Sequence, residues 1–587
     1  MQSTSDKSGK GGPQTLRKII GYLPKLTIFA LRRFGAARWA VFLAVFGVTV
    51  EYLTLTIMLP LAGTRNIGFG AQVTSAWRAV AHAIGFADGT RTWLWLFLLL
   101  LAFRILLGFA QVSLNSYVGK RIMAFLSGGA VEQVVVHEPL ALIHRRSVGR
   151  YLAMADYEAA RVGQIFFNSV QMFSALLAAL IGLAALYLFS TAAFELTAIF
   201  LVLTAIALAA LIGRVFAASG YTLRLGRQVA TTFVEAINGI RSIRSMAGEE
   251  FVVKRFTGLI ARYTRALFVL DMYNYGARAV PALLLSAVGL VALFPGFGFF
   301  GGVSTVFFFS VVVILIRILS FLGEAVTAAG RVITDVRVAF DLDEVLDRSR
   351  LPASSPVAHA ATAVREIKFD DLAYAYKIEH AVIAGISGRL TAGTCYALVG
   401  RSGSGKSTFA DLLLGLLSPQ GGELSLNGTT YSELNMSSLR RRVVLVEQQT
   451  RIFSGTIWDN IAFGLTPTSD QMQLAVDTAG LQEFVNSLTD GLNTQIDYQG
   501  ANLSGGQRQR IGLARALIRQ PDVLILDEAT SALDSQTRDA IIKSVRDMFR
   551  HRILLFVTHD SSVIKWADEV WHIRKGKLSV EPKGETV

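Results

Sequence analysis

Long apolar segments with almost no charged residues are the feature that most restricts how this chain can fold. No Asp, Glu, Lys or Arg lies within residues 162–194, 196–213 or 279–316. A helix needs about 20 mostly apolar residues to cross the hydrocarbon core of a bilayer. The third run is longer than one span and contains Pro295-Gly296-Phe297-Gly298, which is typical of a turn between two helices. We therefore predict six membrane spans, near residues 37–62, 92–115, 164–189, 193–214, 277–295 and 300–323.

Basic residues flank these predicted spans unevenly. Lys and Arg are frequent before the first span and in the stretches 116–163 and 215–276, whereas on the other side only the 63–91 loop holds any. Loops that keep Lys and Arg face the cytoplasm. We expect a multi-pass protein of a bacterial plasma (inner) membrane, in contact with the lipid bilayer and with both termini in the cytoplasm.

The two cytoplasmic stretches are too long for simple connections. Their composition favours helices that continue beyond the bilayer and turn near Leu142–Val148 and Gly239–Met246. A pair of separate amphipathic hairpins lying on the membrane is the alternative. Residues 1–15 form a polar tail that we expect to be disordered, and residues 16–34 resemble a basic amphipathic helix on the inner leaflet.

Net charge separates the chain into two parts. The whole chain has 57 Lys+Arg and 43 Asp+Glu, a formal charge of +14, of which residues 361–587 contribute −1 and residues 1–360 contribute +15. Such an excess is compatible with nucleic acid or an anionic membrane surface. Because most of the excess flanks the spans, it indicates topology, and we expect no nucleic-acid partner. The single cysteine, Cys395, excludes an intramolecular disulfide framework.

A Pro/Ser/Ala-rich linker over residues 349–362 separates a transmembrane domain, residues 16–348, from a second domain, residues 363–587. In the second domain short β-rich runs alternate with helical segments, which predicts an α/β fold. The expected architecture is an α-helical six-span transmembrane domain with long cytoplasmic helix extensions, followed by an α/β P-loop nucleotide-binding domain.

The P-loop prediction rests on a glycine-rich segment that follows a predicted strand and precedes a predicted helix. This segment matches G-x-x-x-x-G-K-[ST], a loop whose backbone N–H groups surround phosphates. Lys406 supplies a positive charge to the β- and γ-phosphate oxygens, and Ser407 offers a hydroxyl to Mg²⁺. The predicted ATP-binding residues of the loop are Gly400, Ser402, Gly403, Gly405, Lys406, Ser407 and Thr408.

Two carboxylates end a second apolar run, Val523-Leu-Ile-Leu-Asp527-Glu528. We expect Asp527 to hold Mg²⁺ through its coordination shell and Glu528 to polarise the attacking water. Two acids after a strand are usually solvated loop residues, and the functional interpretation depends on the phosphate loop in the same domain.

Between these motifs lies Leu503-Ser504-Gly505-Gly506-Gln507, and with it the whole chain resembles an ATP-binding cassette transporter, specifically an exporter-type half-transporter with fused domains. The resemblance implies an ATP hydrolase coupled to transport, a translocase that uses ATP and Mg²⁺. It also implies roles for further residues: Tyr376 stacks on adenine, Gln448 links metal and water, His559 contacts the γ-phosphate, and Asp534 signals across a dimer.

In this family the signature residues Ser504, Gly505, Gly506 and Gln507 close over ATP held by a second cassette. The resemblance therefore implies a dimer with two ATP sites; a homodimer is the simpler case, and a heterodimer stays open. One departure is visible, because Asp497-Tyr498-Gln499-Gly500 stands where exporters often have Gly-Glu-Arg-Gly. The polar contacts that couple the domains must then differ.

The expected function is ATP-driven export or flipping of an amphiphile by alternating access. The spans exclude a soluble cassette ATPase and the fused architecture disfavours an importer, while an ATP-gated channel is a remote alternative. Charges inside the spans are costly unless they face a cavity or a partner. The candidates for a substrate cavity are Glu51, Arg104 and Arg317. Two arginines from each protomer would suit an anionic lipid or a lipid-linked saccharide; export of a hydrophobic or antimicrobial peptide, or of drugs, is the alternative.

Overall fold

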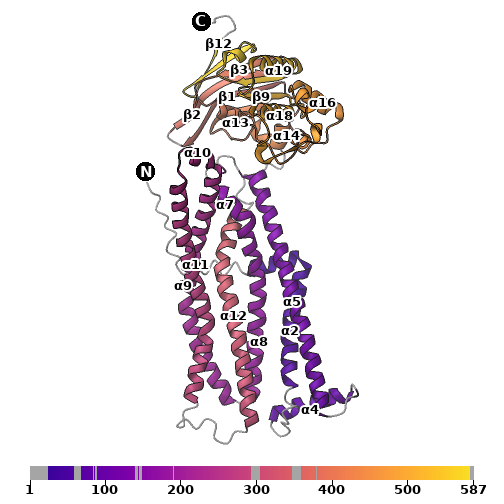
Figure 1. Cartoon of the computed structure of the whole chain (residues 1–587), viewed down its shortest axis with the longest axis vertical. Helices are drawn as coiled ribbons and strands as arrows, with labels where there is room; N and C mark the ends of the chain where they lie inside the picture. Colours follow the sequence, from indigo (N-terminus) through magenta and orange to yellow (C-terminus); the bar gives the residue numbers. More distant parts are fainter. Residues whose placement is uncertain are drawn as a thin grey trace. The chain divides into compact units, whose positions relative to one another are not determined.

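The computed structural model describes residues 24–57, 68–83, 85, 89–138, 143, 148–189, 191–292, 305–346, 359–377 and 380–581. The chain divides near residue 350 into a helical unit and an α/β unit, the cassette (Figure 1).

Six long helices of the helical unit include most of the six predicted spans, of which residues 58–62, 293–295 and 300–304 lie outside the described residues, and the helices lie alongside one another in Figure 1. They are α2 (Gly35–Thr56), α5 (Thr90–Glu132), α8 (Ala159–Phe189), α9 (Thr191–Asn238), α11 (Glu249–Ala292) and α12 (Thr305–Leu346). Within the described residues, three helices are long and apolar enough to cross a membrane, namely Gly35–Thr56, Thr90–Val136 and Val148–Leu188. The helices agree with the predicted fold, and the count of six spans stays a prediction.

Four of these helices are much longer than a bilayer requires. The longest, α9, has 48 residues, about 72 Å at 1.5 Å per residue. Since α9 and α11 each run without a break, the 215–276 stretch contains continuations of the spans, and the alternative of a separate hairpin there is wrong. A short helix, α10 (Ile240–Ser245), connects them at the predicted turn. The other predicted turn, 142–148, lies outside the described residues apart from Ile143 and Val148.

Local differences from the sequence expectations are few. Helix α4 (Gly68–Ala83) occupies part of the predicted 63–91 loop. Single π-helical turns, at Gln133–His137 and Met154–Glu158, interrupt regular helix between α5 and α8, where α7 (Val148–Ala153) also lies. Residues 24–33 are helical, whereas residues 1–23, the 295–299 turn and residues 349–358 of the linker lie outside the described residues.

Small residues allow close helix packing in this unit. Ala30, Ala37, Ala40 and Ala44 are buried in one cluster with Phe166. At the crossing of α5 and α8, a Cβ added to Gly119 would lie 3.0 Å from the carbonyl oxygen of Gly163. In lipid, where apolar surface gains little by burial against another helix, such close contacts drive association.

Two sheets form the cassette. The larger has the order β12-β11-β3-β10-β9-β6 and is parallel from β11 to β6; the smaller is antiparallel, with the order β2-β1-β4-β5. A short pair, β7 and β8, stands apart. The strands are β1 (Glu366–Lys377), β2 (His380–Thr391), β3 (Cys395–Val399), β4 (Gly421–Leu426), β5 (Thr429–Thr430), β6 (Val443–Val446), β7 (Gly455–Thr456), β8 (Gln495–Ile496), β9 (Val523–Asp527), β10 (Ile553–Val557), β11 (Glu569–Arg574) and β12 (Lys577–Glu581).

Helices cover the larger sheet, and two buried apolar clusters fill the space between the layers. Strands β3, β9 and β10 are almost entirely buried, which explains their continuous apolar sequences. Residues 359–362, assigned to the linker by composition, already contact the cassette, since His359 pairs with Leu434 and the Ala361 N–H donates to Ser438 Oγ. The helices are α13 (Lys406–Leu413), α14 (Met436–Arg442), α15 (Ile457–Ala462), α16 (Ser469–Thr478), α17 (Gln482–Asn486), α18 (Gly505–Leu517), α19 (Ser535–Met548) and α20 (Ser561–Ile564).

Candidate functional site

Four neighbouring parallel strands, β3, β10, β9 and β6, bring the predicted catalytic residues to one edge of the larger sheet, and Gln448 follows β6. The phosphate loop follows β3, His559 follows β10, and β9 ends in Asp527 and Glu528. Because parallel strands end at the same edge, residues that are more than 100 positions apart in the chain become neighbours there. This edge, together with the N-terminus of α13, is the candidate site.

The phosphate loop has the backbone shape that glycine permits. Gly403 and Gly405 have φ of +77° and +108°, and a Cβ added to Gly405 would lie 2.9 Å from the Val382 carbonyl oxygen. Lys406 Nζ donates to the carbonyls of Gly400 (2.8 Å) and Arg401 (3.2 Å), so its ammonium lies over the loop. The buried Ser404 hydroxyl has no partner among the described residues. The loop therefore fits the phosphates of a nucleotide.

Tyr376 lies beside this loop, at the end of β1. Its hydroxyl is 3.4 Å from Thr408 Oγ1, and 41% of the residue is exposed. The neighbouring Tyr374 ring meets it edge to face, with 5.1 Å between centroids. An exposed ring held in this way has a face available for stacking on a base.

Asp527 and Ser407, both predicted to hold Mg²⁺, are in direct contact. Ser407 Oγ donates to Asp527 Oδ2 at 3.2 Å. Burial raises the pKa of Asp527 above its ordinary value, and Glu528 adds to the rise, whereas the Ser407 hydroxyl and Lys406 lower it. The described residues hold no cluster of three or more His, Cys, Asp or Glu side chains that would bind a metal by themselves. One carboxylate, one hydroxyl and the Gln448 amide oxygen fit Mg²⁺, which prefers a few oxygen ligands completed by phosphates and water.

Glu528 is held by two side chains. Gln448 Nε2 donates to its Oε2 at 2.6 Å, and His559 Nδ1 lies 2.7 Å from its Oε1. The backbone of Glu528 has a φ of +46°, and its N–H donates to the Val557 carbonyl at 3.0 Å. An unfavourable φ at a non-glycine residue marks a position that the surrounding structure fixes. Glu528 is therefore in direct contact with both other predicted catalytic residues, Gln448 and His559.

The signature residues begin α18. Ser504 and Gln507 form a reciprocal capping box, with Ser504 N–H to Gln507 Oε1 at 2.7 Å and Gln507 N–H to Ser504 Oγ at 3.2 Å. Gly505 and Gly506 form the first turn, whose free N–H groups make a helix start attractive to anions. Asp534 caps α19, accepting the Thr537 N–H at 2.9 Å.

The segment that departs from the family pattern is a tight turn. Gln499 and Gly500 have φ of +57° and +69°. Arg508, on α18, donates to the carbonyls of Gly500 (3.1 Å) and Leu503 (2.7 Å). The turn is thus fixed to the signature helix by an arginine that motif reasoning did not single out.

The sequence analysis also did not identify a pair of exposed aromatic rings. Phe453 and Phe463 are 50% and 43% exposed, and their ring centroids are 5.0 Å apart. Arg515 lies over Phe463 at 4.8 Å, and burial lowers the pKa of its guanidinium to about 10. Neither Phe453 nor Phe463 belongs to a recognised motif, and the sequence did not indicate an aromatic pair, because only the fold brings the two rings together. Large exposed aromatic pairs are unusual on a soluble surface and favour an interaction site.

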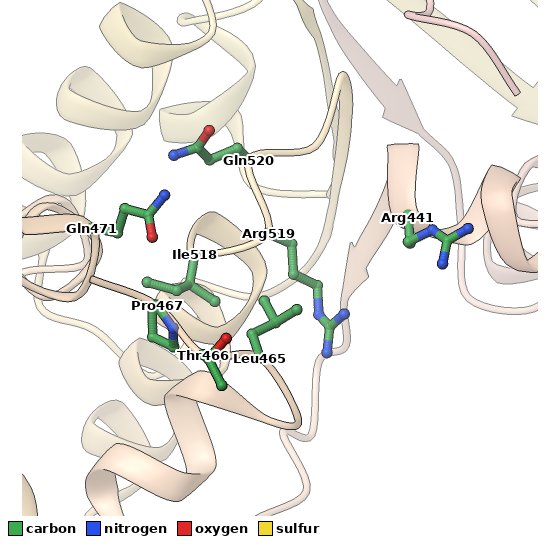
Figure 2. A pocket seen from close by; sticks show the side chains of 8 residues that line it. All are labelled: Arg441, Leu465, Thr466, Pro467, Gln471, Ile518, Arg519 and Gln520. Carbon is green, nitrogen blue, oxygen red and sulfur yellow. The ribbon is translucent and has the colours of Figure 1, made fainter. Parts of the chain in front are cut away.

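A separate cleft of about 340 Å³ lies on the cassette between the 465–471 segment and the end of α18. Figure 2 shows the amides of Gln471 and Gln520 on one side and Arg519 with Leu465 on the other. Its lining contains none of the motif residues.

In the helical unit the three candidate cavity residues come together. Glu51 on α2 lies 2.8 Å from Arg104 on α5 and 3.3 Å from Arg317 on α12. The Glu51 side chain is 9% exposed, whereas those of Arg104 and Arg317 are 30% and 38% exposed. One carboxylate therefore lies between two guanidiniums, and the cluster has a net charge of +1.

Comparisons with known proteins match both parts of the chain to transporters. Residues 65–325 match the family described as ABC transporter transmembrane region, and residues 383–531 match the family described as ABC transporter. The lipid A-core flippase of Mannheimia succiniciproducens is 28% identical, and the match covers 82% of this chain and 85% of that protein. The mitochondrial iron–sulfur clusters transporter ABCB7 of Rattus norvegicus is 30% identical over 59% of this chain, which spans about half (47%) of that relative's length.

A solved bacterial Atm1-family ABC exporter with ATP bound has the same fold. The TM-score is 0.77 at 22% identity, and the match covers 92% of this chain and 95% of the other. The chain belongs to the ATP-binding cassette transporters and joins the membrane region and the cassette of an exporter half-transporter in one polypeptide.

Proposed function

We propose that this protein hydrolyses ATP to export or flip an anionic amphiphile across a bacterial inner membrane. The contact of Glu528 with both Gln448 and His559 carries the enzymatic part of the proposal. A carboxylate fixed at the end of β9, next to a phosphate loop, is placed to accept a proton from water.

The chain's own residues supply most of the chemistry. Lys406 and the loop amides would hold the β- and γ-phosphates, while Tyr376 would stack on the base. Both Glu528 oxygens already accept a hydrogen bond, and each keeps a lone pair for a water molecule. Gln448 and His559 would then orient the carboxylate. Mg²⁺, held by Asp527, Ser407 and Gln448, would neutralise charge on the transferred phosphoryl group.

A second copy of the chain is the proposed partner. One chain contains one cassette, and the free N–H groups at the start of α18 can bind a γ-phosphate held by another cassette. Two identical chains then form two complete ATP sites. Closure of the cassettes would drive the helices between inward- and outward-open states, with both termini in the cytoplasm.

The Glu51–Arg104–Arg317 cluster supports an anionic cargo. Glu51 neutralises one arginine, so a dimer would present two net positive charges within its helices. The arginine heads are more exposed than the glutamate, and a guanidinium binds phosphate or carboxylate through paired N–H groups. The lipid A-core flippase relative, which aligns over 85% of its length, is consistent with a lipid carrying phosphate or saccharide.

The test is the ATPase activity of the purified protein in lipid discs, measured with anionic lipids, lipid-linked saccharides, peptides and dyes. We expect anionic lipids to stimulate turnover in the wild type and Arg104→Ala and Arg317→Ala to remove most of that stimulation. Arg214→Ala, which alters an exposed arginine of α9, is the control. Stimulation by peptides alone would instead indicate a peptide exporter, and anionic stimulation that survives both substitutions would refute the arginine site.

A further inference from the structure

A buried polar side chain in the signature helix makes contacts that no motif explains. Gln509, in the second turn of α18, is only 6% exposed. A buried amide is retained only where its donors and acceptor are satisfied. Gln509 Nε2 donates to the Gln448 carbonyl at 3.3 Å and to Ser531 Oγ at 3.3 Å, and its Oε1 accepts the Ala532 N–H at 3.0 Å.

Two of these three partners, Gln448 and Ser531, contact Glu528 themselves. Gln448 contacts Glu528 through its own side chain at 2.6 Å. Ser531 donates its backbone N–H to the Glu528 carbonyl at 3.1 Å. Ala532 lies two residues before Asp534, the cap of α19. Gln509 thus joins α18 to the Gln448 segment after β6 and to the Ser531–Ala532 segment that follows Glu528.

A second contact, one turn further along α18, strengthens the connection between this helix and the Gln448 segment. Gly512 packs so closely on Thr450 that an added Cβ would lie 2.5 Å from Thr450 Oγ1. Residues three apart on a helix face the same side. The Gln448–Thr450 segment therefore touches α18 at two points on one face, and a displacement of the helix is passed to it.

We infer that Gln509 is a positioning residue that couples the signature end of α18 to Gln448 and to the Ser531–Asp534 segment, and so connects the two ATP sites of the dimer. The inference rests on the proposed function, in which α18 touches the ATP of the partner cassette. Movement of α18 on the partner's nucleotide would shift both segments beside Glu528, because one amide binds both. ATP binding in one site would thus set the geometry of hydrolysis in the other.

The test is a pair of double-mutant cycles on the full-length protein in lipid discs, with kcat and KM for ATP as readouts. Gln509→Met keeps the side-chain length but leaves the Gln448 carbonyl and the Ala532 N–H without their partner. We expect kcat to fall about tenfold, a loss typical of coupling between sites, while KM changes less than about threefold. Gln473→Met, on the exposed face of α16, is the control and should leave kcat unchanged.

The cycles separate positioning from a general loss of packing. If Gln509 acts through both segments, Gln509→Met should add less than about twofold to the loss caused by Gln448→Ala or by Asp534→Ala. Losses that multiply in either cycle would overturn the two-sided coupling. If Gln509→Met does not fold, Ser531→Ala, which removes one partner, replaces it in the same cycles. Absence of ATPase activity in the wild type would refute the proposed function itself, whereas an active wild type with multiplying losses refutes only the role of Gln509.

Discussion

Glu528 in the cassette and Glu51 in the helical unit are each held by two side chains, but the partners and surroundings differ. Glu528 is bound by an amide and an imidazole, neither of which need carry charge, and its side chain is 17% exposed. Glu51 lies between two guanidiniums that are always charged, and its side chain is 9% exposed. The first arrangement leaves a negative charge available to a water molecule. The arrangement around Glu51 neutralises the carboxylate charge and leaves a net positive charge of one on the cluster.

The two glutamates also differ in what happens when the carboxylate charge is removed. A buried carboxylate between arginines is a fixed part of the structure, because removing it leaves two cations in an apolar bundle. A carboxylate between neutral donors can lose its charge without leaving a charge unpaired. Glu528 should therefore determine rate with little effect on folding, and Glu51 should determine stability and cargo with little effect on basal hydrolysis.

The largest effect is expected for Glu528→Gln. Loss of the proton acceptor should lower kcat by about 10²- to 10⁴-fold, while ATP binding is retained because the phosphate loop is unchanged. ATPase assays and binding of a fluorescent ATP analogue measure the two quantities. Glu51→Gln, the matched change, should leave basal kcat within about threefold. Equal losses in the two variants would remove the distinction between the glutamates.

His559→Ala should have the next largest effect. The carboxylate keeps its charge and its Gln448 bond but loses the partner at 2.7 Å that fixes Oε1. Loss of an orienting partner typically lowers activity by about 10- to 100-fold, which is less than the loss of Glu528 itself. His551→Ala changes an exposed histidine of the same domain and is the control. A kcat for His559→Ala equal to that of the control would mean that Gln448 alone orients the carboxylate.

Glu51→Gln is expected to lower thermal stability. Two guanidiniums would lose their shared counter-charge, and we expect a loss of about 1–2 kcal/mol, below the value for a fully buried pair because both arginines are partly exposed. The midpoint of thermal unfolding in detergent measures it, with Glu195→Gln, an exposed glutamate at the start of α9, as the control. The double variant Glu51→Gln/Arg317→Gln should recover part of the loss, since only one cation is then unpaired. A double variant less stable than the single one would contradict this account.

The two glutamates also differ in how much of their surroundings could be predicted from the sequence. Glu528 and its neighbours lie in short motifs whose spacing is set by strand, loop and helix, so position and role followed from local pattern. The partner Arg317 is 266 positions from Glu51, and only the packing of α12 on the bundle brings it within 3.3 Å. The sequence indicated that the charges of Glu51, Arg104 and Arg317 are costly inside a membrane, but not that one carboxylate serves both arginines.

Other features lay beyond local pattern for the same reason. The six apolar runs predicted the long helices well, because period and length are local properties. Helix α4 was missed because its 16 residues are too few for a membrane span, which was the pattern sought in this part of the chain. The Phe453–Phe463 pair was missed because each ring lies in a different segment. Gln509 lies two residues after the signature, yet nothing in the sequence shows that its amide would meet both Gln448 and Ser531.

A third carboxylate, Asp459, extends the comparison to full exposure and should give the smallest effect. It forms the capping box of α15 with Thr456, and the Thr456 backbone N–H and hydroxyl lower its pKa below the ordinary value. Because the pKa of Asp459 is lower in the folded state, its charge stabilises the cap at pH values above the pKa of the unfolded state, about 4. The stabilisation is lost as the pH falls through the pKa of the folded state. Asp459→Asn should reduce the hydrogen-exchange protection of the α15 amides about two- to threefold at pH 6. Variant and wild type should show equal protection at a pH low enough to protonate Asp459 in the wild type. A difference that persists in acid would show that the amide distorts the cap and that charge is not the cause.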